Sequence, residues 1–214
     1  MNIYLIRHAQ SMPRGSEPFS QWRLSPIGVR QAAALAVLLG PLGISRVYSS
    51  PFVRSMETAR PLADALALDV RVVDDLRERK PTNDSGPPLG ASWYQAWCRA
   101  WDDFTFAPPG CESSLAAQAR IVHAIGGIAQ TETGVAAVFT HGHVLALFLN
   151  AVTGAFGRRD AEQLTNPDIA RVEWKNGVFT WGREFRLAGL KDIVTLHEDT
   201  PLEETAPPQG EGCD

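Results

Sequence analysis

Apolar and polar positions along the chain divide it into short strand-like runs separated by longer helix-like segments. The run at 2–6 is apolar, β-branched and aromatic, and the run at 135–140 is apolar almost throughout, which is typical of strands covered on both faces. Shorter runs at 45–50 and 70–73 indicate two further strands. Because helical segments alternate with these strands, we expect a mostly parallel open sheet with helices on both faces.

The helical segments carry recognisable start and stop signals. Ser25-Pro26 offers an N-cap followed by proline at the first helical position, and Gly40-Pro41 is expected to end the same helix. Later segments are bounded by similar Pro, Gly and Ser clusters. The sequence therefore predicts helices at 27–39, 51–68, 92–104, 113–130 and 144–152.

The second helix has two local peculiarities. Ser50-Pro51 repeats the capping pattern, so the helix is expected to start there and to hold Arg54 in its first turn. Pro61 lies inside the same segment and is expected to kink or split it.

The last structured segment is a predicted hairpin. Residues 171–174 and 178–181 flank Lys175-Asn176-Gly177, and an Asn-Gly pair is the strongest short hairpin signal. No internal repeat or linker is visible before this point, so residues 1–196 are expected to form a single α/β domain.

Composition places the chain in the ordinary globular class. Of 214 residues, 44% are hydrophobic and 21% charged. No apolar run approaches the roughly 20 residues of a membrane span, and no signal peptide is recognisable at the start. The three cysteines contain no C-x-x-C pair, so we expect a cytoplasmic protein that does not act at a membrane.

Charge is distributed unevenly between the body and the end of the chain. Six of the 24 acids fall in 197–214, which has no Lys or Arg, so the body carries 20 basic and 18 acidic groups. We therefore expect an acidic, disordered tail at 197–214. A nearly neutral body without a basic stripe argues against nucleic-acid binding.

Three of the expected strands lead into cationic or titratable residues. They are followed by Arg7-His8, by the helix start that holds Arg54, and by His141. Ligands of open α/β sheets bind beyond the carboxyl ends of the strands, so these side chains should meet in one crevice. Such a cluster is unfavourable unless an anion neutralises it, and arginine forks match phosphate oxygens. A phosphate-type anion site is therefore expected.

Sequence blocks over residues 1–150 resemble the histidine phosphatase (phosphoglycerate mutase-like) superfamily, whose signature opens with Arg-His-Gly. The resemblance implies a phosphoglycerate mutase-like three-layer sandwich. After the opening Arg7-His8-Ala9, the blocks in family order are LSPIGVRQA at 24–32, SSPFVRSMETA at 49–59, Leu76-Arg77-Glu78, PGCES at 109–113 and Thr140-His141-Gly142.

The resemblance also implies a role for each matching residue. His8 is the expected nucleophile, which accepts the phosphoryl group while a backbone carbonyl holds its other ring nitrogen. Arg7, Arg54 and His141 are expected to bind the phosphoryl oxygens, with His141 also counted among the catalytic residues. Glu78 is the expected general acid and base. No metal or cofactor is implied, because the Arg-His cluster supplies the positive charge.

Four departures from the mutase pattern favour hydrolysis over phosphoryl isomerisation. Ala9 replaces the signature glycine. Ser11 is followed by Met12-Pro13-Arg14 rather than by a Trp-Asn pair, and His143 stands where mutases carry Asn. The stretch from 78 to 112 is also short. Ser11, Arg14 and His143 are accordingly candidate substrate contacts, and the expected substrate is a small phosphomonoester.

Several alternatives stay open from the sequence. The chain could be a mutase with the same residues, or a phosphate- or phosphoprotein-binding domain without turnover, for which Ala9 is the hint. Glu78 could belong to a solvated turn, and His141 with His143 could form a metal pair, although no third ligand is evident. Three tryptophans at helical spacing should pack their helix onto the body, or one could line the site; they are Trp93, Trp97 and Trp101.

Overall fold

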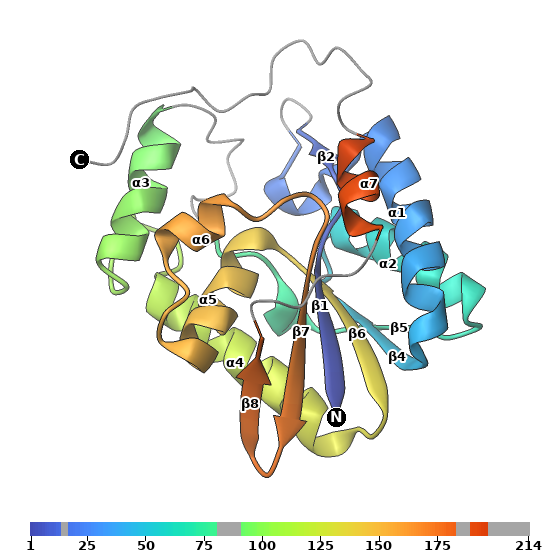
Figure 1. Cartoon of the computed structure of the whole chain (residues 1–214). Helices are drawn as coiled ribbons and strands as arrows, with labels where there is room; N and C mark the ends of the chain where they lie inside the picture. The colour runs from blue at the N-terminus through green and yellow to red at the C-terminus, as the bar shows by residue number, and fades with distance from the viewer. Residues whose placement is uncertain (14–16, 81–90, 183–188, 197–214) are drawn as a thin grey trace.

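A computed structural model describes residues 1–13, 17–80, 91–182 and 189–196, with the backbone alone at 91–93. It consists of a six-stranded sheet between two layers of helices (Figure 1). The single α/β domain expected from the sequence is confirmed. Arg14 and the predicted tail at 197–214 lie outside the described residues.

The main sheet has the strand order β5-β4-β6-β1-β7-β8. The first four strands run parallel, and β7 and β8 extend the sheet antiparallel to β1. A separate two-stranded ribbon pairs β2 with β3. The strands are β1 (Asn2–Arg7), β2 (Ser11–Met12), β3 (Arg23–Leu24), β4 (Ile44–Ser49), β5 (Val70–Val72), β6 (Val135–Thr140), β7 (Asp168–Lys175) and β8 (Val178–Trp181).

Helices cover both faces of the sheet (Figure 1). One layer holds α1 (Pro26–Leu39), α2 (Val53–Ala65) and α7 (Leu190–Thr195), and the other holds α4 (Ser114–Thr131), α5 (Gly142–Thr153) and α6 (Arg158–Glu162). Helix α3 (Ala91–Asp102) lies outside α5. Three short 3-10 helices complete the described elements: Phe19–Gln21, Gly40–Leu42 and Asp74–Leu76.

Two apolar clusters form the core, one on each face of the sheet. Alternate strand residues supply them, since side chains on a strand point to opposite faces with period two. Ile6 and Phe139 pack with α1 and α2, whereas Leu5 and Val138 pack with α4 and α5. All four are fully buried. The continuous apolar runs in β1 and β6 are explained by this burial on both sides.

The second helix differs from its prediction at both ends. Helix α2 begins at Val53, its N-cap Phe52 makes no side-chain hydrogen bond, and it ends at Ala65, earlier than expected. Pro61 lies inside it without splitting it. The prediction that Ser50-Pro51 caps this helix is wrong, because Ser50 lies two residues before the N-cap. Its hydroxyl accepts from the Phe52 N–H at 3.2 Å and is also hydrogen-bonded to the His141 ring at 2.8 Å.

Other local predictions are confirmed. Ser25 caps α1, with its hydroxyl accepting from the Gly28 N–H at 3.0 Å. Asn176 and Gly177 have φ of 52° and 81°, the left-handed values that a two-residue hairpin turn requires. Helix α1 ends at Leu39, directly before Gly40-Pro41, and the chain continues as a 3-10 turn over Gly40–Leu42. The sequence prediction missed the β2–β3 ribbon, α6 and α7.

Among the described residues, no helix combines the length and the apolar composition of a membrane span. Cys111 is a free thiol.

Candidate active site

The carboxyl ends of three neighbouring parallel strands bring the predicted residues together. Strands β4, β6 and β1 are adjacent, and in their register Arg7 lies opposite Thr140 while Ser49 lies opposite Phe139. Backbone hydrogen bonds extend this register past the strand ends, from His8 N–H to Thr140 and from Ser50 N–H to Phe139, both at 3.0 Å. The sheet register therefore fixes the backbone positions of His8, Ser50 and His141, the residues that directly follow these strands.

His8 is held in a single tautomer by its two ring contacts. Nδ1 lies 2.7 Å from the Ala9 carbonyl oxygen, and Arg54 donates from Nε to His8 Nε2 at 3.0 Å. A carbonyl oxygen only accepts and a guanidinium only donates, so the proton is on Nδ1 and the Nε2 lone pair faces Arg54. The expectation that a backbone carbonyl holds the second ring nitrogen is confirmed.

The charge state of His8 follows from its surroundings. The ring is only 7% exposed. Burial, followed by the positive charges of Arg54 and Arg7, lowers the pKa of His8 well below its usual 6.5. The imidazole is therefore neutral at neutral pH, with a free lone pair on Nε2.

Arg54 is a buried cation in the first turn of α2, as predicted. Its guanidinium carbon lies 4.3 Å from the ring centre of Phe19 and 5.1 Å from that of Phe52, and Nη1 donates to the Phe19 carbonyl at 2.6 Å. Burial lowers the pKa of Arg54 to about 10, a shift that Glu78 opposes. Arg54 thus stays charged at neutral pH while its aromatic neighbours keep water away.

Arg7 is anchored by carbonyls of the α6–β7 connection. Its Nη1 donates to Leu164 O at 2.6 Å and to Thr165 O at 3.3 Å. Its Nε is buried without a hydrogen-bond partner. A Cβ at Gly142 would lie 2.9 Å from that Nε, so the absence of a side chain at 142 leaves room for the guanidinium. Burial lowers the pKa of Arg7, against the charges of Glu78 and Asp168.

His141 completes the cationic cluster. Its ring centre lies 5.2 Å from that of His8, edge to face, and its Nε2 lies 2.8 Å from Ser50 Oγ. Nδ1 is buried and unpartnered. Burial and then the charge of Arg54 lower the pKa of His141 well below 6.5. The unpartnered atoms of His141 and Arg7 are costly unless a ligand meets them, and two buried guanidiniums require that ligand to be an anion.

Glu78 lies on the other side of this cluster, at the N-terminus of α5. One carboxylate oxygen accepts from the Arg79 and Val144 N–H groups at 2.8 and 3.1 Å, and the other accepts from the His143 N–H at 3.0 Å. An anion is favourable at a helix N-terminus. The alternative of a solvated turn is wrong for Glu78, although Asp74 does pair with a surface arginine.

The sequence prediction missed Arg120, which holds the loop before Glu78. It donates to the carbonyls of Asp75 and Arg77 at 2.8 Å and of Glu78 at 3.2 Å. Both Glu112 oxygens accept from the same guanidinium at 2.7 Å. Glu112 belongs to the PGCES block at 109–113, so this block was the sequence feature from which the support of the Glu78 loop could have been predicted.

Polar residues from distant elements also fix the backbone around His8. Asn166 donates from its amide to the His8 carbonyl at 2.8 Å. Thr58 accepts from the Ala9 N–H at 3.1 Å and donates to the Arg54 carbonyl at 2.7 Å. Thr58 is in the SSPFVRSMETA block, whereas no sequence signal marked Asn166.

Ala9, which replaces the glycine of the family signature, has room for its methyl group. Its side chain is fully buried in a small apolar cluster with Leu24 and Ala32. The additional methyl group is therefore accommodated by packing contacts, and the Ala9 carbonyl still reaches His8.

The three candidate substrate contacts have different positions. Ser11 lies in β2 opposite Leu24, and its hydroxyl makes no hydrogen bond among the described residues. His143 is 8% exposed beside Glu78, and its ring stacks on Trp101 with centres 5.4 Å apart. Arg14 is outside the described ranges.

The remaining sequence alternatives can be compared with the structure. Among the described residues, no group of three His, Cys, Asp or Glu side chains could hold a metal ion. Trp97 and Trp101 pack onto the core as predicted, and both also contact the ring of His143. The side chain of Trp93 lies outside the described part.

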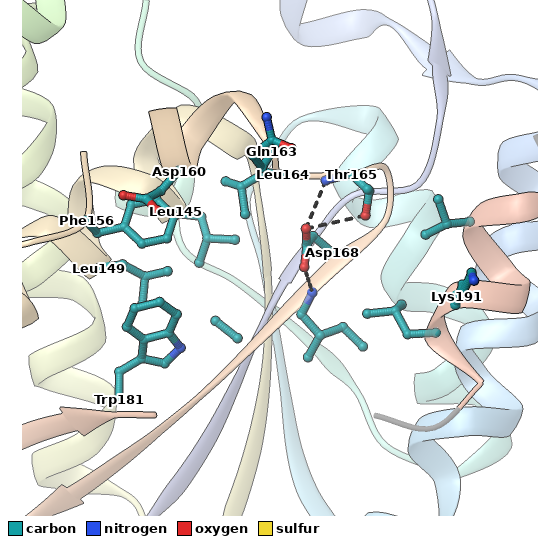
Figure 2. A pocket seen from close by; sticks show the side chains of 14 residues that line it. Leu145, Leu149, Phe156, Asp160, Gln163, Leu164, Thr165, Asp168, Trp181 and Lys191 are labelled. Carbon is teal, nitrogen blue, oxygen red and sulfur yellow. Dashed lines mark hydrogen bonds between the residues drawn. The ribbon is translucent and has the colours of Figure 1, made fainter. Parts of the chain in front are cut away.

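A cavity of about 690 Å³ lies beside the cluster rather than on it. Figure 2 shows its lining, which comes from α5, α6, β7, β8 and α7, with Asp168 accepting hydrogen bonds from Thr165. Leu164 and Thr165 belong both to this lining and to the carbonyl pair that anchors Arg7.

Comparison with known proteins identifies the family. The family model described as histidine phosphatase superfamily (branch 1) matches residues 3–184. A probable phosphoglycerate mutase, GpmB of Proteus mirabilis, is 28% identical over 187 residues, or 82% of this chain and 86% of that protein. The bifunctional protein Rv2228c of Mycobacterium tuberculosis is 37% identical over 122 residues, or 52% of this chain and 32% of that protein.

Solved structures show the same fold. The mycobacterial glucosyl-3-phosphoglycerate phosphatase Rv2419c, complexed with inorganic phosphate, has a TM-score of 0.69 at 21% identity, covering 85% of this chain and 95% of its own. YhfR of Bacillus stearothermophilus has a TM-score of 0.71 at 21% identity, covering 86% and 96%. By their names, these relatives include a probable mutase and a phosphatase. The chain belongs to the histidine phosphatase superfamily.

Proposed function

We propose that this protein hydrolyses a small phosphomonoester, without a metal ion, through a phosphohistidine intermediate on His8. The observation that carries the proposal is the state of the His8 ring. It is neutral, its proton is confined to Nδ1, and its Nε2 lone pair faces a buried cation at 3.0 Å. A nucleophile for phosphorus needs these three properties together.

In the first step, His8 Nε2 forms a bond to phosphorus as the bond to the leaving oxygen breaks. Arg54 exchanges its hydrogen bond with His8 for the incoming phosphoryl oxygens, together with Arg7 and the free Nδ1 of His141. The two guanidiniums neutralise charge that is spread over the equatorial oxygens during in-line transfer, and the neutral His141 ring contributes a hydrogen bond. The displaced oxygen takes a proton from Glu78, and the leaving group departs as the alcohol.

In the second step, water attacks the phosphohistidine. Glu78 accepts a proton from that water, the bond between phosphorus and Nε2 breaks, and inorganic phosphate is released. Because Glu78 is held by backbone N–H groups rather than by the cations, it can exchange protons without breaking the cluster that binds phosphate. The names of the matched relatives, which include a phosphatase of a phosphorylated small molecule, support this substrate class.

The experiment is phosphate release from para-nitrophenyl phosphate by the purified chain. We expect turnover that persists with a chelator, and a loss of roughly 10⁴-fold in His8→Ala, with an unchanged circular dichroism spectrum. A wild-type protein stopped with an alkaline denaturant during turnover should carry phosphate on His8, and that phosphate should be lost on acidification. Retained activity in His8→Ala would overturn the proposal.

Phosphoglycerate mutase chemistry is the second candidate, favoured by the match to GpmB. Both activities share the phosphohistidine step and differ in the final acceptor. Incubation with 3-phosphoglycerate distinguishes them, because a phosphatase releases inorganic phosphate whereas a mutase forms 2-phosphoglycerate.

A further inference from the structure

The Ser50 hydroxyl links the N-terminal end of α2 to the ring of His141. Its oxygen accepts from the N–H of the N-cap residue Phe52 at 3.2 Å and lies 2.8 Å from His141 Nε2. The Ser50 N–H is bound to the Phe139 carbonyl at 3.0 Å, so the sheet holds the backbone that carries this hydroxyl. Ser50 and His141 are both fully buried. Bulk water therefore does not reach the contact, and its hydrogen atoms need acceptors within the protein.

The inventory of donors and acceptors assigns the direction of the hydrogen bond between Ser50 and His141. The hydroxyl has one hydrogen and two lone pairs, and the Phe52 N–H occupies one of these lone pairs. Among the described residues, the hydroxyl makes only these two hydrogen bonds. If His141 donated from Nε2, the hydroxyl hydrogen would be buried without an acceptor, which is unfavourable. The hydroxyl therefore donates, and Nε2 accepts with its lone pair.

The single proton of the neutral His141 ring is then on Nδ1. Burial, and then the charge of Arg54, lower the pKa of His141 well below 6.5, so the ring carries one proton at neutral pH. Because Nε2 accepts from Ser50, that proton lies on the nitrogen that is buried without a partner. An N–H at this place can donate to a phosphoryl oxygen, whereas a lone pair there would repel it.

We propose that Ser50 is a positioning residue that fixes His141 in the Nδ1–H tautomer, so that its ring donates a hydrogen bond to the phosphoryl group. This inference rests on the proposed function, because that phosphoryl group is the one transferred to His8. Both rings then carry their proton on Nδ1, but they use opposite nitrogens. His8 presents its Nε2 lone pair to phosphorus, and a backbone carbonyl holds its proton. His141 presents its proton to oxygen, and a hydroxyl occupies its lone pair.

Nitrogen-15 NMR of the histidine rings reads the tautomer directly, because protonated and unprotonated ring nitrogens resonate in separate regions. The loss of signals in His141→Gln identifies those of His141. In the wild-type protein at neutral pH, we expect a protonated Nδ1 and an unprotonated Nε2, both without ligand and with inorganic phosphate. In Ser50→Ala, Nε2 loses its donor, so both nitrogens should shift toward the average of the two tautomers.

Ser49→Ala is the matched control. Ser49 precedes Ser50 and is also fully buried, but its hydroxyl is hydrogen-bonded to the Ser50 carbonyl and to the Ser55 hydroxyl, both at 2.9 Å. This variant loses the same chemical group without removing a partner of the His141 ring. The His141 signals should therefore keep the wild-type pattern. An equal shift in Ser49→Ala and Ser50→Ala would assign the change to general repacking and overturn the proposal.

A double-mutant cycle tests whether Ser50 acts through His141. Ser50→Ala should lower kcat/KM for para-nitrophenyl phosphate roughly 10-fold. This is less than the roughly 10²- to 10³-fold cost of deleting an oxyanion donor, because the Nδ1–H tautomer still forms part of the time. In His141→Gln, the added Ser50→Ala change should cost less than about twofold, since no ring is left to orient. Losses that multiply in the double variant would overturn the positioning role.

The two measurements separate this inference from the proposed function. A wild-type His141 that carries its proton on Nε2, or an Nδ1–H pattern that Ser50→Ala leaves unchanged, overturns the role of Ser50 alone, because phosphate release from para-nitrophenyl phosphate does not depend on this result. Absence of that release in the wild-type protein overturns the proposed function, and with it the role of the His141 N–H in phosphoryl transfer.

Discussion

The two halves of the site are held in different ways. On the nucleophile side, Arg7, His8 and His141 follow directly from neighbouring strands, so the ladder of β1 and β6 sets their positions. On the acid side, Glu78 follows a 3-10 turn and depends on backbone N–H groups of α5 and on the carbonyls that Arg120 holds. Sheet register thus places the proposed nucleophile, whereas side-chain hydrogen bonds place the proposed general acid.

This difference has a consequence for substitution. A change among the strand-end residues removes a charge from the site while the sheet stays intact. A change in the supports of the acid side moves the Glu78 carboxylate without touching any group that contacts phosphate. The two kinds of change should therefore separate in kinetics and in stability.

The largest expected effect is on the nucleophile side. Arg54→Ala should lower kcat/KM for para-nitrophenyl phosphate about 10³-fold, because it removes the cation that contacts His8 Nε2 and that binds the transferring oxygens in the proposed mechanism. Steady-state phosphate release measures this. Arg60→Ala, an exposed arginine on the same helix, is the control and should change the rate less than twofold; equal losses in both would contradict the assignment.

Both halves should contribute to a loss of stability as pH falls. The buried rings of His8, His141 and His143 have lowered pKa values, whereas unfolded histidines protonate below about pH 6.5. The unfolded state then binds more protons, so the free energy of unfolding should fall by about 1.4 kcal/mol per pH unit for each ring that stays neutral.

Urea unfolding between pH 7 and pH 5 checks this slope. His143→Gln should reduce it by roughly 1 kcal/mol per pH unit averaged over this window, and by about 1.4 near pH 5, where an unfolded histidine is almost fully protonated. The folded ring stays neutral over the whole window because its pKa is about 3. A slope that is the same in the variant would show that His143 protonates in the folded protein.

The next effect concerns the support of the acid. Arg120→Met should cost about 3 kcal/mol of stability, because it leaves the Glu112 carboxylate without its bidentate partner. Glu112→Gln,Arg120→Met, which removes both charges, should recover part of that stability. In both variants we expect kcat to fall while the inhibition constant Ki of inorganic phosphate, measured by product inhibition, stays nearly constant. A rise in this Ki would mean that the two halves are not independent.

The smallest expected effect on kcat/KM is at Gly142, where helix α5 on the acid side meets Arg7 on the nucleophile side. Gly142→Ala introduces a Cβ 2.9 Å from Arg7 Nε, so we expect a roughly 10-fold loss of kcat/KM as the guanidinium shifts. Gly127→Ala in α4 meets no atom within 4 Å and should instead stabilise the protein by about 0.5 kcal/mol. An unchanged kcat/KM in Gly142→Ala would show that Arg7 tolerates displacement.

The strand-end residues were predictable because their signals are local. Arg7-His8 directly follows an apolar run, Arg54 follows a helix-start pattern, and His141 follows a second apolar run, so the topology of a parallel sheet was enough to bring them together. The hairpin at 176–177 was predictable for the same reason, since its turn chemistry lies in two adjacent residues. The predicted capping role of Ser50 was wrong because the helix begins only at Val53, while the Ser50 hydroxyl contacts both the Phe52 N–H and the His141 ring.

The chain by itself determined the periodicity of its elements, the sheet class and the identity of the cations that meet beyond the strand ends. Only the tertiary structure decided which groups hold them: Asn166 on the His8 carbonyl, Arg120 under the Glu78 loop, and the stack of Trp101 on His143. The reason is physical. Strand and helix preferences act over a few residues, whereas these hydrogen bonds and ring contacts join residues 42 to 158 positions apart and exist only after the sheet has formed.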